Sequence, residues 1–395
     1  MIRRRTVLAT VVAATAAALL VPGTATAGPG RSDFSHSHNV CSAPRDGEAA
    51  CIAEEVDDAV SLKPLATTSY VNGYTPAQLR SAYGPFGTNT MTIAIVDAYA
   101  SPNAAADLAV YRTQFGLGPA NLTQVNQNGG PITTVTANVG WGQEEMLDLE
   151  MASAICPQCA LIYVGANSAS FTDLSAAVTR AKLMGAKVIS NSYGASEFRG
   201  ETTQTAWNIP GVAVTVSSGD SGYGASYPAA AAGVIAVGGT SLKLDANGNR
   251  LSETVWTGAG SGCSAYIAKP SWQRDSGCSR RTIADVSAVA DPATGVAVYS
   301  SYGSTGGANW FVFGGTSVAA PIIAGVFAQG ADFGATEQVA KRLYTNASSL
   351  YDVLSGSNGK CTSRTSTALA YLCTGVVGYD GPTGNGTPKG LTAPF

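Results

Sequence analysis

Ser317 has the sequence surroundings of a nucleophilic hydroxyl. A strand-like run at residues 310–313 leads into two glycines, and a helix is predicted at about 318–329. The serine therefore lies at a helix N-terminus, where free backbone N–H groups and the helix dipole favour a developing anion. A serine that only caps this helix fits the same stretch equally well. Its role depends on whether the chain supplies a base.

Histidine is a poor candidate for that base, because the two histidines, His36 and His38, precede the predicted domain. Glu144 and Asp148 are four residues apart on a predicted helix at about 142–154, so they share one helix face. Two such carboxyls resist double ionisation and share a proton in moderate acid. The pair could accept a proton from serine and return it to a leaving amine.

The plainer interpretation of this acidic stretch is a solvated helix face whose carboxylates are favoured by the helix dipole. We assign Glu145 and Glu150 to such a face.

Asp220 follows a predicted buried strand, in a turn rich in Gly and Ser. An Asx-turn is the common role of aspartate there, but a protonated Asp220 could instead donate a hydrogen bond to an oxyanion.

Apolar strands and helices alternate along the chain from about residue 70. This order predicts an α/β fold with a mainly parallel sheet and helices on both faces. Ligands of such sheets bind beyond the carboxyl ends of the strands. Asp97, Asp220 and the turn before Ser317 all lie at such predicted ends.

The composition gives no sign of a nucleic-acid-binding protein and is compatible with an acid-tolerant secreted one. The net charge of −3 gives no reason to expect nucleic acid as a partner. Charged residues form only 12 % of the chain, about half the usual share of roughly 25 %. Because the chain has few carboxylates that acid can protonate, repulsion between its charges stays mild at low pH. This is compatible with an acid-tolerant secreted protein.

The N-terminus has the pattern of an export signal. Three arginines precede an apolar run, and Ala25-Thr26-Ala27 is a small-residue cleavage site. We expect residues 1–27 to be a signal peptide that directs export by either the general or the twin-arginine route. After its removal we expect no association with a membrane.

Residues 28–68 are polar and aperiodic and are interpreted as a short propeptide or a disordered arm. Residues 69–395 are expected to form a single catalytic domain, beginning with a helix capped by Thr75.

Eight cysteines in an exported chain suggest disulfides. Their order favours pairing between neighbours, as Cys41/Cys51, Cys156/Cys159, Cys263/Cys278 and Cys361/Cys373. The sequence alone allows other connectivities, and Cys156-Pro157-Gln158-Cys159 could also belong to a redox or zinc site. Zinc is disfavoured, because there is no second Cys-x-x-Cys and no nearby histidine.

Three separated motifs resemble those of the sedolisins, the serine-carboxyl peptidases with a subtilisin-like fold. They are Glu144-x-x-Leu147-Asp148, Ser218-Gly219-Asp220 and Gly315-Thr316-Ser317-x-x-x-Pro321. The resemblance covers about residues 70–395. It implies that Ser317 is the nucleophile and Glu144 the general base. It also implies that Asp148 shares the proton of Glu144 and that Asp220 is the oxyanion carboxyl.

The resemblance implies further roles outside the triad. Asp97 would support the catalytic glutamate, as a strand-end acid does in many sedolisins. Ser192, Tyr193 and Gly194 would form an edge that binds an extended peptide by strand addition, although an ordinary strand end fits them as well. Sedolisins typically have a long folded prodomain, whereas about forty residues separate the predicted signal from the domain here.

The resemblance also implies one structural Ca²⁺ ion near the C-terminus. Two carboxylates with backbone carbonyls suit such a hard cation, although two surface aspartates in turns are the alternative. Val376 stands where the family usually has glycine, but only its carbonyl is needed. The ligands transferred by position are Asp352, Val353, Val376, Gly378 and Asp380.

The sequence thus predicts a secreted, monomeric, acid-active serine-carboxyl endopeptidase that cleaves polypeptides through a Ser-Glu-Asp triad and an acyl-enzyme. Tripeptidyl-peptidase action is left open. The alternative is an exported binding protein that has this fold but no catalytic activity. A lipase-like esterase is disfavoured, because it would need Gly-x-Ser-x-Gly and a histidine.

Overall fold

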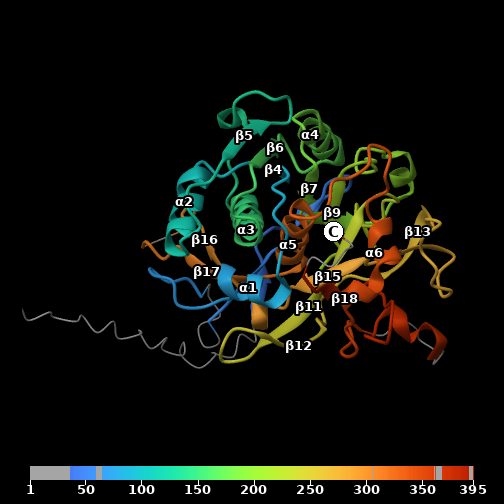
Figure 1. Cartoon of the computed structure of the whole chain (residues 1–395). Helices are drawn as coiled ribbons and strands as arrows, with labels where there is room; N and C mark the ends of the chain where they lie inside the picture. The colour runs from blue at the N-terminus through green and yellow to red at the C-terminus, as the bar shows by residue number, and fades with distance from the viewer. Residues whose placement is uncertain (1–35, 59–64, 305, 360, 362–366, 391–394) are drawn as a thin grey trace, which may run out of the picture.

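The computed structural model describes residues 36–58, 65–304, 306–359, 361, 367–390 and 395 (Figure 1). The predicted signal peptide lies outside the described residues. Within them, no helix is both long enough and apolar enough to cross a membrane.

An eight-stranded sheet forms the centre of the molecule, in the order β12-β11-β9-β7-β4-β6-β5, with β15 also paired to β11. Neighbouring strands are parallel, except that β12 runs antiparallel to β11. The predicted mainly parallel sheet is confirmed. The strands are β4 (Ile93–Ala98), β5 (Leu122–Asn126), β6 (Leu161–Ala166), β7 (Val188–Asn191), β9 (Ala213–Ser217), β11 (Ile235–Leu244), β12 (Arg250–Val255) and β15 (Val286–Val289).

Helices cover both faces of this sheet, because its strands are apolar on both sides. In β4, Ile93 and Ile95 pack into one hydrophobic core, while Ala94 and Val96 pack into a second core on the opposite face. The first core includes α3 and α5, which lie side by side, and the second includes α4. The helices are α1 (Pro76–Tyr83), α2 (Ala104–Gln114), α3 (Val139–Ile155), α4 (Phe171–Leu183), α5 (Thr316–Ala328) and α6 (Lys341–Thr345).

The predicted start of α1 is confirmed. Thr75 Oγ1 accepts a hydrogen bond from Gln78 N, and the Gln78 side chain accepts one from Thr75 N, which together form a capping box. Pro76 occupies the first helical position, where its missing N–H has no consequence.

The segment before the predicted domain differs from the expected disordered arm. Residues 37–56 contribute β1 (Ser37–Asn39), β2 (Ala50–Cys51) and β3 (Glu54–Val56) to sheets of the domain. Backbone pairing orders this polar stretch even though it has few apolar side chains. The packed structure therefore begins upstream of residue 69.

A second sheet corrects the expected position of the strand before Ser317. This strand is β17, and it belongs to a four-stranded antiparallel sheet, in the order β1-β3-β17-β16, rather than to the parallel sheet. A third sheet has the order β10-β8-β2. The strands not yet given are β8 (Tyr193–Ser196), β10 (Ser226–Tyr227), β13 (Gly262–Ala268), β14 (Arg280–Ile283), β16 (Val296–Tyr299), β17 (Trp310–Gly314), β18 (Leu350–Tyr351) and β19 (Thr387–Pro388).

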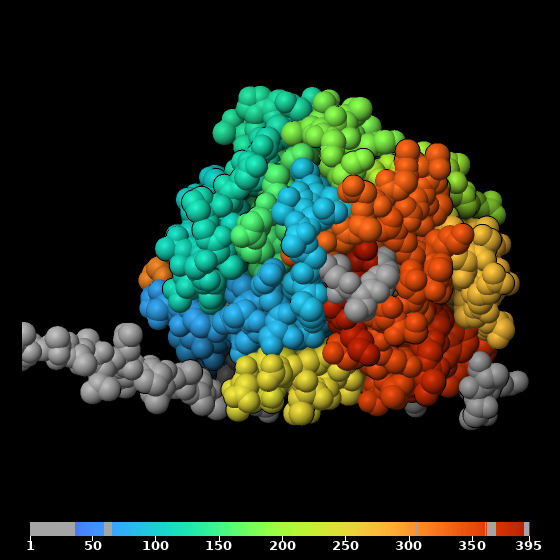
Figure 2. Space-filling view, viewed as in Figure 1, coloured from blue at the N-terminus to red at the C-terminus, as the bar shows by residue number. Residues whose placement is uncertain are grey.

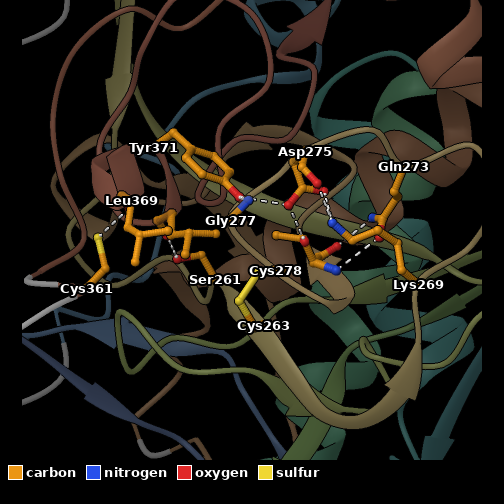
Figure 3. The surroundings of a disulfide bond; sticks show 12 residues. Ser261, Cys263, Lys269, Gln273, Asp275, Gly277, Cys278, Cys361, Leu369 and Tyr371 are labelled. Atoms are coloured by element: carbon orange, nitrogen blue, oxygen red, sulfur yellow. Dashed lines mark hydrogen bonds and ion pairs between the residues drawn. A yellow bond between two sulfur atoms is a disulfide. The ribbon is translucent and has the colours of Figure 1, made fainter. Parts of the chain in front are cut away.

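All four predicted disulfides are confirmed, as Cys41–Cys51, Cys156–Cys159, Cys263–Cys278 and Cys361–Cys373. Pairing of Cys156 with Cys159 leaves no thiol there for zinc. The third disulfide ties β13 to the segment before β14, beside the loop that contains Asp275 (Figure 3).

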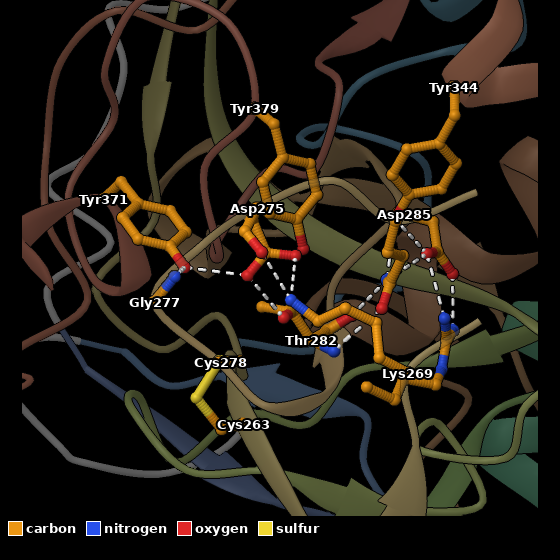
Figure 4. A network of polar contacts seen from close by, with 12 residues as sticks. Cys263, Lys269, Asp275, Gly277, Cys278, Thr282, Asp285, Tyr344, Tyr371 and Tyr379 are labelled. Carbon is orange, nitrogen blue, oxygen red and sulfur yellow. Dashed lines mark hydrogen bonds and ion pairs between the residues drawn. A yellow bond between two sulfur atoms is a disulfide. The ribbon is translucent and has the colours of Figure 1, made fainter. Parts of the chain in front are cut away.

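The C-terminal third packs against both the sheet and the N-terminal segments. In the space-filling view its orange and red atoms lie next to the blue segments from the first hundred residues (Figure 2). A buried polar network holds this region: Asp285 accepts hydrogen bonds from Arg281 and from the hydroxyl of Tyr344 in α6, each at 2.6 Å (Figure 4). The C-terminal region is thereby fixed to the end of the central sheet.

Candidate active site

The elements bring four predicted residues from distant parts of the chain to one place. Glu144 and Asp148 face inward from α3, Ser317 lies in the first turn of α5, and Asp220 follows β9. Glu144, Asp148 and Ser317 are completely buried. Long apolar stretches on α3 and α5 pack these two helices together, which positions the serine against the carboxyls.

Gly315 permits the sharp turn from β17 into α5. Its φ is +98°, a conformation that side chains disfavour. A Cβ atom built there would lie 2.5 Å from Asp220 Oδ2. Glycine is therefore required both by the backbone conformation and by the closeness of Asp220.

The Ser317 hydroxyl lies between α3 and the start of β8. It donates a long hydrogen bond of 3.5 Å to the carbonyl oxygen of Ser192. Burial raises the pKa of Glu144 well above its usual value, and the charge of Asp97 raises it further, while a hydrogen bond with the Ser317 side chain opposes both effects. Ser317 and Glu144 thus lie close together, although Glu144 Oε1 has no hydrogen-bond partner among the described residues.

Asp148 and Asp97 complete a coupled group of carboxyls around Glu144. Asp148 Oδ1 accepts a hydrogen bond of 2.7 Å from Ser192 Oγ. Its pKa is raised by burial and then by the charges of Asp97 and Glu144. Asp97 lies at the end of β4, and neither of its carboxyl oxygens has a hydrogen-bond partner among the described residues. A buried carboxyl without donors favours its protonated form.

Asp220 points at the N-terminus of α5. Its Oδ1 accepts hydrogen bonds from Thr316 N at 2.8 Å and from Thr316 Oγ1 at 2.6 Å. Burial raises its pKa well above the usual value, the nearby charge of Glu54 adds to this, and the two contacts with Thr316 oppose it. Asp220 Oδ2 has no partner among the described residues, so a proton on this oxygen would be available for donation.

Glu145 and Glu150 do not form the expected solvated face, because both are completely buried. Helix α3 is packed between β4, β16 and the helices α1, α2 and α5, which leaves it no exposed side there. Burial raises the pKa of Glu145 to about 8. Glu150 Oε2 accepts a hydrogen bond of 3.0 Å from Tyr299 N in β16. These two carboxyls tie α3 to its neighbours.

The predicted peptide-binding edge, Ser192 to Gly194, lies beside the serine and is already paired. On one side β8 pairs with β10. On the other side it pairs with β2, in an antiparallel register that sets Cys51 opposite Tyr193 and Ala50 opposite Gly194. The chain's own N-terminal segment therefore occupies this edge.

Residues 50–54 are the part of the site that the sequence did not predict. The backbone N–H groups of Ile52 and Ala53 both donate to Glu144 Oε2, at 3.0 Å and 2.9 Å. A cavity of about 400 Å³ lies alongside, lined by Ile52, Gly194 and Asp220 among others. The sequence feature that could have indicated this contact is the apolar run from Ala49 to Ala53. It overlaps the end of the loop that the Cys41–Cys51 disulfide closes, in an otherwise polar arm.

The predicted calcium ligands gather around the turn at residues 376–380. Asp352 Oδ2 accepts a hydrogen bond of 2.8 Å from Gly378 N, and Asp380 Oδ2 accepts one of 3.3 Å from Val376 N. Burial raises the pKa of Asp380 to about 7, and the charge of Asp352 contributes to this shift. No group of three or more His, Cys, Asp or Glu side chains that could hold a metal occurs among the described residues. Two carboxyls around one turn, with backbone carbonyls, still match the oxygen donors that calcium prefers.

Comparison with known proteins identifies the family. A model described as the subtilase family matches residues 126–370. The chain belongs to this family. Among curated relatives, sedolisin of Pseudomonas sp. (strain 101) is 31% identical over 84% of this chain and 62% of its own length. Kumamolisin of Bacillus sp. (strain MN-32) is 29% identical over 65% of this chain and 52% of its own length. The chain thus spans between half and two thirds of these relatives.

Solved structures support the same grouping within the subtilase family. A structure of Pseudomonas sedolisin, described as a serine-carboxyl proteinase complexed with two molecules of pseudo-iodotyrostatin, has 27% sequence identity and a TM-score of 0.67. The match covers 81% of this chain and 96% of that one. A structure named S41 psychrophilic protease, at 21% identity and a TM-score of 0.51, shares the fold. The resemblance to sedolisins and the subtilisin-like fold are confirmed.

Proposed function

We propose that this subtilase is a serine-carboxyl peptidase that hydrolyses polypeptides in acid. The main support is that the packing of α3 against α5 buries Ser317, Glu144 and Asp148 together, with the buried Asp97 close enough to raise the pKa of both carboxyls on α3. In this role Glu144 accepts the proton of Ser317 as the hydroxyl attacks the scissile carbonyl, and Asp148 and Asp97 share protons with it. The relatives' printed names, sedolisin and serine-carboxyl proteinase, agree with this chemistry.

Asp220 supplies the oxyanion contact in this proposal. A protonated Oδ2 donates to the oxygen that becomes negative in the tetrahedral intermediate, while Oδ1 stays bound to Thr316. Collapse of the intermediate breaks the C–N bond, and the proton held by Glu144 passes to the leaving nitrogen. Water then hydrolyses the acyl-enzyme, and Glu144 again takes and returns a proton.

The required protonation states favour acid. Asp220 must be neutral, and the group Asp97, Glu144 and Asp148 must retain protons while leaving one carboxylate as the base. Raised pKa values keep these protons bound above the ordinary carboxyl range. Rising pH removes them, so activity is expected to fall on the alkaline side.

A digestion assay tests this function against the alternative of a binding protein without activity. Wild type should digest casein at pH 3–5 and resist pepstatin, and a peptide aldehyde should inhibit it. Ser317→Ala should lower turnover by a factor on the order of 10⁴ or more. Equal activity of the two proteins would refute the role of Ser317, and no digestion by wild type at any pH would favour the binding protein.

We also propose that the protein is exported and that Asp352, Asp380 and the carbonyls of Val353, Val376 and Gly378 hold a structural calcium ion. A bound cation would supply positive charge between two carboxylates that otherwise repel each other. A chelator should therefore lower the melting temperature at pH 7, and added Ca²⁺ should restore it. Asp352→Asn should reduce the response to the chelator. A melting temperature that ignores both chelator and Ca²⁺ would count against the site.

A further inference from the structure

A groove in the C-terminal third of the chain lies away from the candidate active site. It consists of two adjoining cavities of about 530 Å³ and 560 Å³, which share Ser271, Trp272, Lys341 and Thr345 among their lining residues. We propose that this groove binds a phosphorylated segment of the polypeptide substrate, and that Arg274 and Lys341 recognise its phosphate group. This inference rests on the proposed peptidase function and names a class of substrate for it.

The groove and Ser317 lie at opposite ends of β15. Asp285, which binds Tyr344 of the groove, directly precedes this strand, and Ala290 directly follows it. The carbonyl oxygen of Ala290 accepts a hydrogen bond from Gly315 N, in the turn before Ser317. The extended strand between Asp285 and Ala290 spans about 17 Å. A group bound in the groove therefore belongs to a part of the substrate that is remote from the cleaved bond.

The two carboxylates along the groove are already paired. Asp275 Oδ1 lies 2.8 Å from Lys269 Nζ, and its Oδ2 accepts hydrogen bonds from two hydroxyl groups (Figure 4). Glu337 forms an ion pair with Arg342. Since each carboxylate has its own cation, neither contributes much repulsion toward an anion that enters the groove.

Three hydrogen-bond donors on the groove have no such partner. The side chains of Ser271, Arg274 and Lys341 are exposed and form no hydrogen bond or ion pair with the described residues. A site with free donors and occupied carboxylates favours a ligand that has only acceptors, such as an oxyanion. Arginine and lysine are the side chains that proteins use most for phosphate. Each cavity is far larger than one phosphate group, which leaves room for the peptide that carries it.

The acidic working range selects a phosphate rather than a carboxylate. Side-chain carboxyls of a peptide have ordinary pKa values of about 4, so they are largely neutral below that pH. A phosphate monoester has its second pKa near 6 and keeps one negative charge after that proton has bound. Arginine and lysine side chains are positive throughout this range. The attraction for a phosphorylated segment therefore persists under the conditions in which we expect cleavage.

Buried contacts fix the wall of the groove. The rings of Tyr344 and Tyr379 lie 5.9 Å apart at an angle of 32°. The Tyr344 hydroxyl donates to Asp285 at 2.6 Å, and the Tyr379 hydroxyl donates to the carbonyl oxygen of Ala284 at 2.9 Å (Figure 4). Lys341 begins α6, the helix that contains Tyr344. Its backbone is therefore held in place before a ligand binds, which lowers the entropic cost of binding.

Cleavage of matched fluorogenic peptides tests the proposal. They carry phosphoserine, serine or glutamate about ten residues from the cleaved bond, on either side of it, because an extended chain of that length spans about 33 Å. At pH 4 the phosphorylated form should have a KM about tenfold lower than the serine form at equal kcat, on at least one side. The glutamate form should gain less at pH 3.5 than at pH 5.5. Equal KM values for the phosphorylated and serine forms on both sides would overturn the proposal.

Three substitutions of exposed cations locate the effect. Arg274→Gln and Lys341→Gln should each raise the KM of the phosphorylated peptide, and the double variant should lose its preference, with the serine peptide unaffected. Arg280→Gln is the matched control, because Arg280 is exposed on β14, donates to the carbonyl oxygen of Tyr266 at 2.9 Å and does not line the groove. It should keep the full preference. A double variant that also keeps it would refute the role of the groove.

Binding measurements separate this inference from the peptidase function itself. Fluorescence anisotropy of labelled phosphopeptide with Ser317→Ala reports on the groove without cleavage. If wild type cleaves all forms with equal KM, the inference fails and the function stands. If wild type cleaves none, but Ser317→Ala binds the phosphopeptide through Arg274 and Lys341, the function fails and the binding site stands. Inorganic phosphate should compete more weakly than free phosphopeptide, and equal competition would overturn the assignment to a polypeptide.

Discussion

At the scale of single residues, the site consists of carboxyls that burial holds close to neutral. Asp97, Glu144, Asp148 and Asp220 all have raised pKa values, and burial is the largest cause for each. The charge of one carboxyl disfavours ionisation of the next, so protons are shared within the group. In the proposed mechanism, such a group supplies Ser317 with a base and with a neutral hydrogen-bond donor without any imidazole.

Asp220 can be tested by two substitutions that differ in hydrogen bonding. Asp220→Ala removes the proposed donor and should lower kcat by roughly 10²–10³. Asp220→Asn keeps a neutral donor that cannot ionise, so it should retain more activity, and the alkaline fall of kcat should move to higher pH. The pH profiles of the three proteins provide the measurement. Near-normal kcat in Asp220→Ala would exclude the oxyanion role.

At the scale of elements, the close packing of α3 against α5 positions Glu144 and Ser317, the proposed base and nucleophile. Gly325 in α5 lies tight against the end of α3, because a Cβ atom there would lie 2.8 Å from Ile155 Cβ and 2.9 Å from Ile155 Cγ2. The branched side chain of Ile155 cannot withdraw from this contact by changing its rotamer. The separation of the two helices therefore depends on a glycine at this position.

We expect Gly325→Ala to be destabilising even though alanine is the better helix former. Alanine gains about 1 kcal/mol in helix propensity, whereas overpacking of a tight core costs typically 1–3 kcal/mol. The predicted net loss is therefore up to about 2 kcal/mol in the free energy of unfolding, measured by urea denaturation. Gly334→Ala is the control, because its Cβ would meet only Glu337 at an ordinary 3.7 Å. Equal stability of the two variants would disprove the tight contact.

At the scale of the whole molecule, buried carboxyls make the fold more stable in acid. Burial raises the pKa of Glu55 to about 7 and that of Glu145 to about 8. Between the unfolded value near 4.5 and these folded values, the unfolded chain releases protons that the native protein keeps. Stability is therefore fully present below about pH 4.5 and is lost as the pH rises toward 8. Each group contributes about 1.4 kcal/mol per pH unit at most.

The melting temperature should accordingly be higher at pH 4 than at pH 8. Glu145→Gln removes one of these buried acids while keeping its shape, so it should raise the melting temperature at pH 8 and flatten the decline. Asp332→Asn, at an exposed position, should leave the pH dependence unchanged. Differential scanning calorimetry across this range provides the comparison. A wild-type melting temperature that rises with pH would show that the sign is wrong.

The sequence determined the local features of this protein. Continuous apolar runs predicted β4, β6, β7 and β9 because both faces of a parallel sheet are covered. The spacing of Glu144 and Asp148 set both on one side of a helix, and neighbouring cysteines paired as their order suggested. The N-cap of α1 at Thr75 was predictable because it depends only on neighbouring residues.

Only the tertiary structure decided which helix faces are buried and which strands pair with one another. Nothing in the spacing of Glu145 and Glu150 distinguishes a solvated helix face from one buried by the elements that pack against α3. Strand β17 looked like a member of the parallel sheet, but its partners are β3 and β16. The polar N-terminal arm is held beside the candidate active site because its strand β2 forms backbone hydrogen bonds with β8, which is far away in the sequence. Such pairing depends on main-chain groups that every residue has, and side-chain patterns therefore do not reveal it.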